Sequence, residues 1–250
     1  MLNALFKGPS AYVPRTGWAA WSVVPAALGI ILLAVLAMLV VALALRSIAG
    51  VTLSSSEAGV GVPLLFAVWQ AFVIVLTLAA AKYHSADLSE VLALRPPAQG
   101  WRVLPLALVP LFLVSGAWAG VLMLLKPDAM LHDLRPFQQL LHGEAFWLVL
   151  FVIGVGAPLS EELLFRGFLF PGLAQSKLGF VGAGILTSFL WMLLHFGYSI
   201  YGLAEVMAIG LYFAWLLVRT GSLWVTMFCH AVYNSAMALG LHFMTLPPGG

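Results

Sequence analysis

Charged residues and cysteine are both scarce in this chain. Asp, Glu, Lys and Arg make up only 8% of the 250 residues, and Cys229 is the one cysteine. A single cysteine excludes an internal disulfide framework and a cysteine-based zinc cluster. The net charge of +2 is too small to indicate a nucleic-acid partner, and none is expected. The chain also lacks an internal repeat and a Gly-rich phosphate loop outside its hydrophobic runs.

Hydrophobic residues are abundant instead. They make up 63% of the chain, and the mean hydropathy is +1.06. Such a composition is typical of a polytopic membrane protein, so we expect an all-α bundle that crosses the bilayer. We expect about seven spans, with a range of six to eight because short re-entrant pieces resemble spans. They are residues 20–45, 61–81, 103–125, 146–170, 178–196, 201–218 and 223–242.

Three polar segments separate these runs. Residues 54–57 are expected to form a polar turn, and residues 82–102 form a connector that Pro96 and Pro97 interrupt. Residues 126–144 are expected to be the longest hydrophilic connection in the second half of the chain.

The distribution of Lys and Arg predicts an orientation. With the N-terminus inside, the inner segments hold eight of these residues and the outer segments hold three, namely Arg46, Lys126 and Arg135. We therefore expect an integral membrane protein with a cytoplasmic N-terminus. A compact chain with no eukaryotic targeting signal favours the bacterial inner membrane.

Two adjacent carboxylates occur in one of the most apolar stretches, residues 158–170. Ionisable groups at bilayer depth are costly, so they usually face a cavity or a partner. On a helix Glu162 and Arg166 share a face and are expected to pair. Glu161 lies roughly 100° away around the helix axis, which leaves it without that partner. Glu161 is therefore expected to act as a proton acceptor.

Two histidines also fall inside expected spans. His230 lies about nine residues past the turn at residues 219–221, roughly 13 Å into the membrane, a depth similar to that of Glu161. Asn234 follows His230 by four residues, so both are on one helix face. His195 reaches the same depth only if its helix is tilted or begins late. Convergence of these groups would explain their presence in the membrane.

A carboxylate base, two imidazoles and an amide are sufficient to hydrolyse a peptide bond. Glu161, oriented by His195, would deprotonate an attacking water, and His230 and Asn234 would donate hydrogen bonds to the oxyanion. The same pattern allows a zinc site, with an open position, formed by Glu161, His195 and His230. The chain has no His-Glu-x-x-His pair and no aspartate in an expected span, which excludes two other membrane-protease chemistries.

Three motifs stand in order on separate expected spans: Glu161-Glu162-x-x-x-Arg166, His195, and His230-x-x-x-Asn234. This pattern resembles the CPBP family, the CAAX-protease and bacteriocin-processing membrane proteins, also called the Abi or Ras-converting-endopeptidase-like family. The resemblance covers about residues 145–240. It divides the chain into N-terminal membrane helices and loops at 1–144, a catalytic core at 145–242 and a short tail at 243–250.

The resemblance implies an all-helical intramembrane endopeptidase. In it Glu161 and His195 would activate water, His230 and Asn234 would form the oxyanion side, and Glu162 and Arg166 would support them. Trp191 stands where the family commonly has phenylalanine, so an aromatic ring is retained. Family members have been described both as metalloproteases and as metal-free glutamate proteases. We expect no cofactor, because Glu161 serves as a base without a metal, and keep zinc as the alternative.

Other functions remain open on the sequence alone. A non-catalytic scaffold or bacteriocin-immunity protein of the same fold would bind a peptide without cutting it. A proton-coupled transporter would use Glu161, Glu162 and Glu205 as a relay, although no inverted repeat supports it. Glu205 has no patterned partner, so a pore role and a packing role are equally compatible with it. The expected partners are the bilayer and a membrane-associated peptide or protein; neither the natural substrate nor the oligomeric state follows from the sequence.

Overall fold

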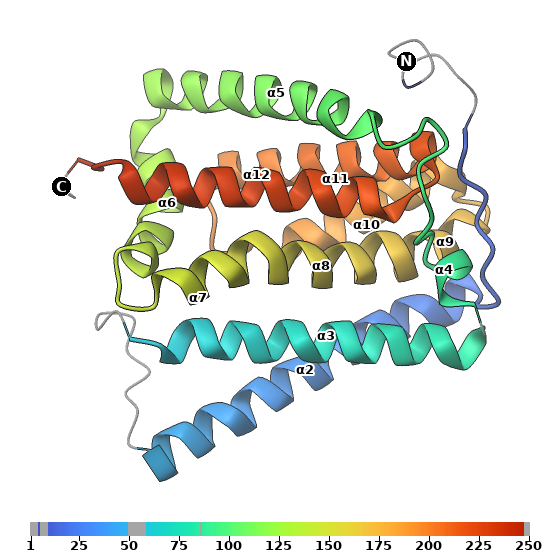
Figure 1. The fold of residues 1–250 in the computed structure, drawn as a ribbon, viewed down its shortest axis with the longest axis horizontal. Coiled ribbons are helices and arrows are strands. Elements are labelled where there is room, and N and C mark those ends of the chain that lie inside the picture. The colour runs from blue at the N-terminus through green and yellow to red at the C-terminus, as the bar shows by residue number, and fades with distance from the viewer. Residues whose placement is uncertain (1–4, 6–9, 50–58, 86, 248–250) are drawn as a thin grey trace.

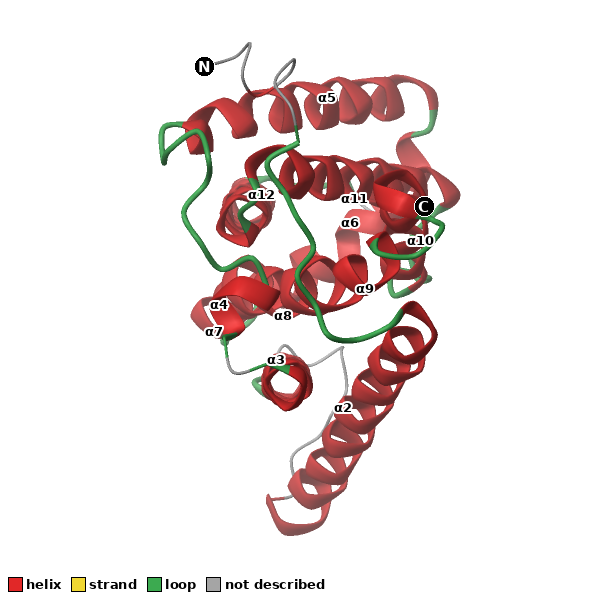
Figure 2. Ribbon diagram, turned by 90° about the vertical axis from the view of Figure 1, so that its right-hand side faces the viewer, coloured by secondary structure: helices red, strands yellow, loops and turns green. Residues whose placement is uncertain are grey.

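A computed structural model of the chain describes residues 5, 10–49, 59–85 and 87–247. Regular structure within these ranges is entirely helical, so the all-α prediction is confirmed (Figure 2). The helices are α2 (Ala20–Ala49), α3 (Gly61–His84), α4 (Leu88–Val91), α5 (Val103–Leu125), α6 (Pro127–Leu141), α7 (Phe146–Phe151), α8 (Ala157–Glu162), α9 (Phe170–Ala174), α10 (Gly179–Leu193), α11 (Ile200–Thr220) and α12 (Leu223–Phe243). The polar turn expected at residues 54–57 lies outside the described residues.

Among the described residues, helices at five of the seven expected spans are long and apolar enough to cross a membrane. They are Ala20–Ser47, Gly61–His84, Val103–Leu125, Phe146–Ala174 and Ile200–Thr220. α10 is apolar but has only 15 residues, and α12 has 21 residues but is interrupted by polar side chains. The chain is thus an integral membrane protein, with these two helices completing the bundle.

The helix Phe146–Ala174 lies in the middle of the bundle (Figure 1). It packs against α3 on one side and α12 on the other, and α10 and α11 pack against each other beside it. α2 lies at the edge and crosses α3 at an angle (Figures 1 and 2). The central helix is therefore covered by protein along much of its length.

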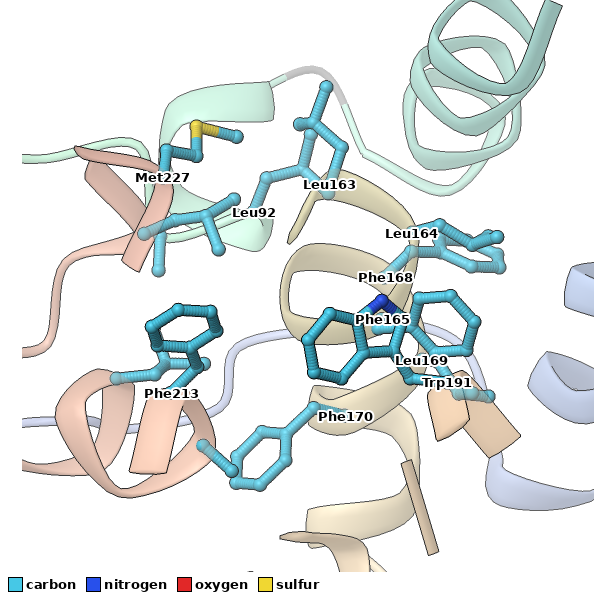
Figure 3. Packing of buried hydrophobic residues seen from close by; sticks show 14 of the residues in the cluster. Leu92, Leu163, Leu164, Phe165, Phe168, Leu169, Phe170, Trp191, Phe213 and Met227 are labelled. Carbon is cyan, nitrogen blue, oxygen red and sulfur yellow. The ribbon is translucent and has the colours of Figure 1, made fainter. Parts of the chain in front are cut away.

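Large apolar side chains fill the space around this central helix. Its segment Leu163–Leu169 is buried throughout, and its rings and leucines meet Trp191 of α10 and Phe213 of α11 (Figure 3). Small residues bring α10 and α11 close together: a Cβ added to Gly184 would lie 3.5 Å from Cβ of Ala214. Close approach of small residues is how helices associate in lipid, where apolar surface alone gives no driving force.

The hydrophilic connection expected at residues 126–144 is mostly helical and forms α6, which was not predicted. Pro127 occupies the first turn, where its missing N–H costs nothing. Leu134, Phe137 and Leu141 recur at helical spacing and belong to an apolar cluster with α7 and α12. The segment is polar on average, so its amphipathic periodicity was overlooked.

Residues 10–18, which we call the N-terminal strap, run along the end of the bundle. The backbone N–H groups of Ala11 and Tyr12 donate to the Val218 carbonyl at 3.1 Å each. The indole of Trp18 donates to the carbonyl of Phe168 at 3.0 Å. Gly221 has a φ of 67°, and a Cβ there would lie 2.9 Å from the Ala11 carbonyl oxygen. The strap thus fastens the start of the chain to α11 and to the central helix.

Candidate active site

The central helix widens on both sides of Glu161 and Glu162. Residues Val152–Gly156 (η1) and Leu163–Leu169 (η2) form π-helical turns that flank α8. Such turns release carbonyl groups from the regular helix pattern and are frequent at functional sites. The Val152 carbonyl accepts a hydrogen bond from Nε2 of Gln70 at 3.1 Å. Gly156 leaves room for that glutamine, because a Cβ there would clash with it.

Glu162 is held by two positively polarised partners. Its Oε1 accepts hydrogen bonds from Nη1 of Arg166 at 3.1 Å and from Nδ1 of His230 at 3.0 Å. The side chains of Glu162 and Arg166 are completely buried, and the predicted i, i+4 ion pair is confirmed. Nη2 of Arg166 donates to the Gly210 carbonyl at 3.0 Å. The charge of Glu162 is therefore compensated inside the protein.

Glu161 has a different environment. Its Oε2 accepts a hydrogen bond from Nε1 of Trp191 at 2.6 Å and lies 3.9 Å from Nε2 of His230. The residue is 9% exposed. As predicted, Glu161 does not pair with Arg166. Its hydrogen-bond donor is instead the indole N–H of Trp191, which was not predicted. This carboxylate thus remains available for proton transfer.

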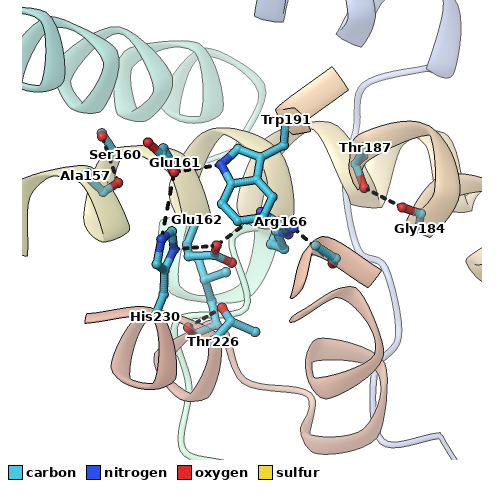
Figure 4. Close-up of polar contacts among 12 residues, drawn as sticks. Ala157, Ser160, Glu161, Glu162, Arg166, Gly184, Thr187, Trp191, Thr226 and His230 are labelled. Carbon is cyan, nitrogen blue, oxygen red and sulfur yellow. Dashed lines mark hydrogen bonds and ion pairs between the residues drawn. The ribbon is translucent and has the colours of Figure 1, made fainter. Parts of the chain in front are cut away.

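His230 links the two carboxylates (Figure 4). An ionised Glu162 accepts hydrogen bonds only, so Nδ1 of His230 carries a proton in this arrangement. Nε2 then points toward Glu161 and the space in front of it. His230 and Glu161 were predicted to lie at a similar membrane depth, and in the structure they are neighbours.

Trp191 joins the two halves of this network. Its ring lies 4.6 Å from Cζ of Arg166 and 5.5 Å from the ring of His230, and it is 3% exposed. Gly210 makes room for it, since a Cβ there would lie 3.1 Å from Cε3 of the indole. The sequence interpretation treated Trp191 only as a retained aromatic. A buried indole N–H needs a hydrogen-bond acceptor. That requirement could have indicated that Trp191 pairs with a carboxylate.

His195 lies two residues beyond the end of α10 and is half-buried. Its Nδ1 is 3.1 Å from the carbonyl of Trp191, and its ring packs on those of Trp191 and Tyr198 at centroid distances of 5.2 and 5.4 Å. The structure connects His195 to Glu161 through the Trp191 side chain. Its role in orienting Glu161 stays a prediction.

Asn234 lies one turn beyond His230 on α12. Its Nδ2 donates to the carbonyl of Ile153, in the first π-helical turn, at 3.1 Å. This bond uses one of the two amide hydrogens and fastens α12 to the central helix. A role as an oxyanion donor stays a prediction, and the contact in the structure is one that positions the helix.

The residues of the alternative zinc site do not fit a metal ion in this arrangement. Across the described ranges, no three side chains of His, Cys, Asp or Glu lie close enough together to hold one. Glu161 and His230 are neighbours, whereas His195 lies behind the Trp191 ring. Glu205 lies outside this network and is bonded to Tyr233.

Comparisons with known proteins match parts of the chain. Residues 143–236 match the family model "Type II CAAX prenyl endopeptidase Rce1-like". A stretch of 96 residues is 30% identical to "Putative membrane peptidase YdiL" of Bacillus subtilis and covers 38% of each chain. A stretch of 51 residues is 39% identical to "UPF0177 protein YxdF" of Lactococcus lactis and covers 20% of this chain and 27% of that protein. The matched stretches thus span well under half of each relative. No solved structure matches the chain.

The matched segment coincides with the region in which charged side chains are buried. It begins at residue 143, close to the start of α7, and ends within α12, so it includes all three motifs. The exact division at residues 144 and 242 stays a prediction. The resemblance drawn from the motifs is confirmed, since residues 143–236 of this membrane protein match the model of the Rce1-like CAAX prenyl endopeptidase family.

Proposed function

We propose that the protein is an intramembrane endopeptidase that hydrolyses a peptide bond in a membrane-associated protein or peptide. Its family supports a membrane peptidase. The observation that carries the proposal is the contrast between two adjacent carboxylates. Glu162 is compensated by Arg166, whereas Glu161 is held by a neutral indole N–H beside an imidazole. One carboxylate is thus fixed and the other is free to accept a proton.

In the proposed reaction Glu161 accepts a proton from a water molecule. The resulting hydroxide adds to the carbonyl carbon of the substrate and forms a tetrahedral intermediate. When the C–N bond breaks, the proton passes from Glu161 to the leaving nitrogen. Trp191 positions the carboxylate through its 2.6 Å hydrogen bond, so that one oxygen is held while the other faces the water.

His230 is suited to the oxyanion side of the same reaction. Glu162 anchors Nδ1, which fixes the direction of Nε2. With a proton on each ring nitrogen, Nε2 donates a hydrogen bond to negative charge that develops on the substrate carbonyl. The second amide hydrogen of Asn234 would add to this, and His195 would steady the Trp191–Glu161 contact from behind. We propose no step through a metal, because the donor set does not converge.

The test compares cleavage by the wild type, Glu161→Gln and Glu144→Gln in nanodiscs, using a library of membrane-anchored peptides. Loss of a general base lowers the rate by about 10²- to 10⁴-fold, so Glu161→Gln should be nearly inactive. Glu144 is exposed and distant from the network, so its variant should match the wild type.

A chelator arm accompanies this experiment. Activity that depends on Glu161 and survives the chelator supports the metal-free reaction. Activity that is lost with the chelator and restored by zinc would instead support a site at Glu161, His195 and His230. Peptide binding without cleavage, even in the wild type, would favour the scaffold or immunity protein. Full activity in Glu161→Gln would contradict the proposed mechanism.

We also propose a location in the bacterial inner membrane with the N-terminus in the cytoplasm. The excess of Lys and Arg on the inner segments supports this orientation, and both relatives come from bacteria. Labelling of a cysteine introduced at Ser176, between α9 and α10, tests it. The thiol of the Ser176→Cys variant should react only with reagents that reach the cytoplasm.

A further inference from the structure

A cavity lies between α5, α6, α11 and α12, outside the Glu161 network. Its volume is about 160 Å³. Most of its wall is apolar, with Phe112, Leu134 and Met237 contributed by three different helices. Its polar groups are Ser115, Asp133, Glu205 and Tyr233. The cavity is far smaller than a pocket for a drug-sized ligand, about 300–1,000 Å³, and its size suits one side chain.

Glu205 is the carboxylate of this cavity that lacks a cationic partner. Its Oε1 accepts a hydrogen bond from the Tyr233 hydroxyl at 3.0 Å, and Ser115 is the other hydroxyl residue of the cavity wall. The cavity wall, all of which the structure describes, contains no Lys, Arg or His. The partners of Glu205 in the wall are therefore neutral hydroxyl groups.

The other carboxylate in the wall, Asp133, is occupied by structural contacts. Its oxygens accept hydrogen bonds from the backbone N–H and the hydroxyl of Ser199, at 2.6 Å each. Nδ1 of His132 also lies 3.0 Å from Asp133. These bonds cap the start of α11 and connect it to α6. Asp133 therefore holds the fold together, and Glu205 is the group free to meet a ligand.

An ionised carboxylate within a helix bundle is costly unless a positive group lies beside it, so without a ligand the neutral form of Glu205 is favoured. A cation that ionises Glu205 has to come from outside the wall. The surrounding surface is apolar, so the best match is an apolar stem that ends in a cation. A lysine side chain has this composition, with four methylene groups that pack on apolar surface and an ammonium at the tip.

Tyr198 lies between the cavity wall and His195, because a Cβ added to Gly202 of the wall would lie 3.2 Å from Cβ of Tyr198. The Tyr198 ring packs on His195 at a centroid distance of 5.4 Å and on Phe137 of α6 at 5.9 Å. Burial raises the pKa of Tyr198, and the nearby charges of Glu161 and Asp133 raise it further. Tyr233 of the cavity wall also directly precedes Asn234 on α12.

We propose that this cavity is a specificity pocket for a lysine side chain of the peptide substrate, with Glu205 as its counter-ion. The assignment rests on the proposed function, because it concerns the peptide that Glu161 would help to cut. A lysine in a membrane-associated segment would be held at Glu205, while a neighbouring backbone segment would extend past Tyr198 toward Glu161.

Binding tests the pocket without any need for hydrolysis. Glu161→Gln protein in phosphatidylcholine nanodiscs is titrated with fluorescent Leu-Ala helical peptides that carry one lysine, norleucine or glutamate, scanned along the central turns. Hydrogen bonds between charged groups are stronger than neutral ones, so the best lysine peptide should bind about tenfold more tightly than its norleucine counterpart, which is about 1.4 kcal/mol. Adding Glu205→Gln should abolish this preference, whereas adding Glu144→Gln should keep it.

Glu205→Gln retains hydrogen-bonding groups toward Tyr233 and Ser115, and an unchanged thermal unfolding profile verifies that it folds. Equal binding of lysine and norleucine peptides, or a preference that survives Glu205→Gln, would overturn the assignment. Competition by phosphatidylethanolamine, with no preference among peptides, would also overturn it and indicate a lipid amine as the occupant. A lysine preference without cleavage by the wild type would reject the peptidase and leave the pocket standing.

Discussion

The helix at the edge of the bundle and the helix at its centre have opposite characters. The most apolar 18-residue window of Ala20–Ser47 has a mean hydropathy of 3.2, the highest among the five candidate spans. Only 11% of this window is buried within the protein. Phe146–Ala174 has a mean hydropathy of 1.8, and 56% of its window is buried. In a soluble protein the most apolar helix would be the most buried. In lipid the relation is reversed, because hydrocarbon solvates an apolar helix as well as protein does.

This difference indicates where function is to be sought. The central helix carries Glu161, Glu162 and Arg166, whose cost in lipid is offset by contacts that protein alone supplies. α2 contributes apolar surface, with Arg46 in its last turn. Substitutions at buried positions in and beside the central helix should therefore differ sharply from substitutions at exposed or loosely packed positions, and three pairs of variants measure by how much.

The largest difference is expected for the two arginines. Arg166→Met leaves Glu162 buried without its main counter-ion, and removal of one member of a buried ion pair costs about 3–5 kcal/mol. Arg46→Met in α2 is exposed and should change the free energy of unfolding by less than about 0.5 kcal/mol. Thermal unfolding in detergent measures both. Similar losses in the two variants would contradict the comparison, and addition of Glu162→Gln should recover part of the Arg166→Met loss.

A smaller effect is expected for two tryptophans. Trp191→Phe keeps the ring but removes the N–H that donates to Glu161. A hydrogen bond to a charged group is worth about 1.5–3 kcal/mol, so kcat should fall about 10- to 100-fold while KM changes little. Trp147→Phe is the matched control, because Trp147 is 77% exposed. An unchanged kcat in Trp191→Phe would show that the indole N–H does not position Glu161.

The smallest effect is expected for two glycines. A Cβ at Gly210 would lie 2.8 Å from Cβ of Ser188 and 3.1 Å from the Trp191 ring, so Gly210→Ala should destabilise by about 1–3 kcal/mol through overpacking. Gly29 of α2 has nothing within 4 Å, and Gly29→Ala should be neutral or gain up to about 1 kcal/mol in helix propensity. Chemical denaturation in detergent compares them. Equal tolerance at both positions would mean that α10 and α11 pack more loosely than described.

Regular helical periodicity predicted much of this molecule. Long apolar runs gave the positions of the main helices, and i, i+4 spacing gave the Glu162–Arg166 pair. Glu161 and His230 lie at similar distances along the chain from their nearest turns, which predicted that they are close together. These inferences succeeded because each depends on one helix, or on a simple distance along the membrane normal.

The unpredicted features depend on contacts between helices or on departures from regularity. The first π-helical turn, Val152–Gly156, accepts hydrogen bonds from Gln70 and Asn234 of two other helices. The Trp191–Glu161 bond depends on the space that Gly210 leaves on α11. α6 was missed because average polarity concealed its apolar face. The contacts between helices have no fixed spacing along the chain, whereas the apolar face of α6 does have helical spacing and could have been found.

The N-terminal strap has a consequence for how the molecule is made. Ribosomes synthesise residues 10–18 first, yet the strap binds Val218, which is made some two hundred residues later, and Phe168. The strap therefore has no docking partner while the first helices enter the membrane. Its contacts with Val218 form only after α11 has been made, so complete docking of the strap belongs to the last stage of biogenesis. A nascent chain released before residue 218 would have its first segment exposed to proteases.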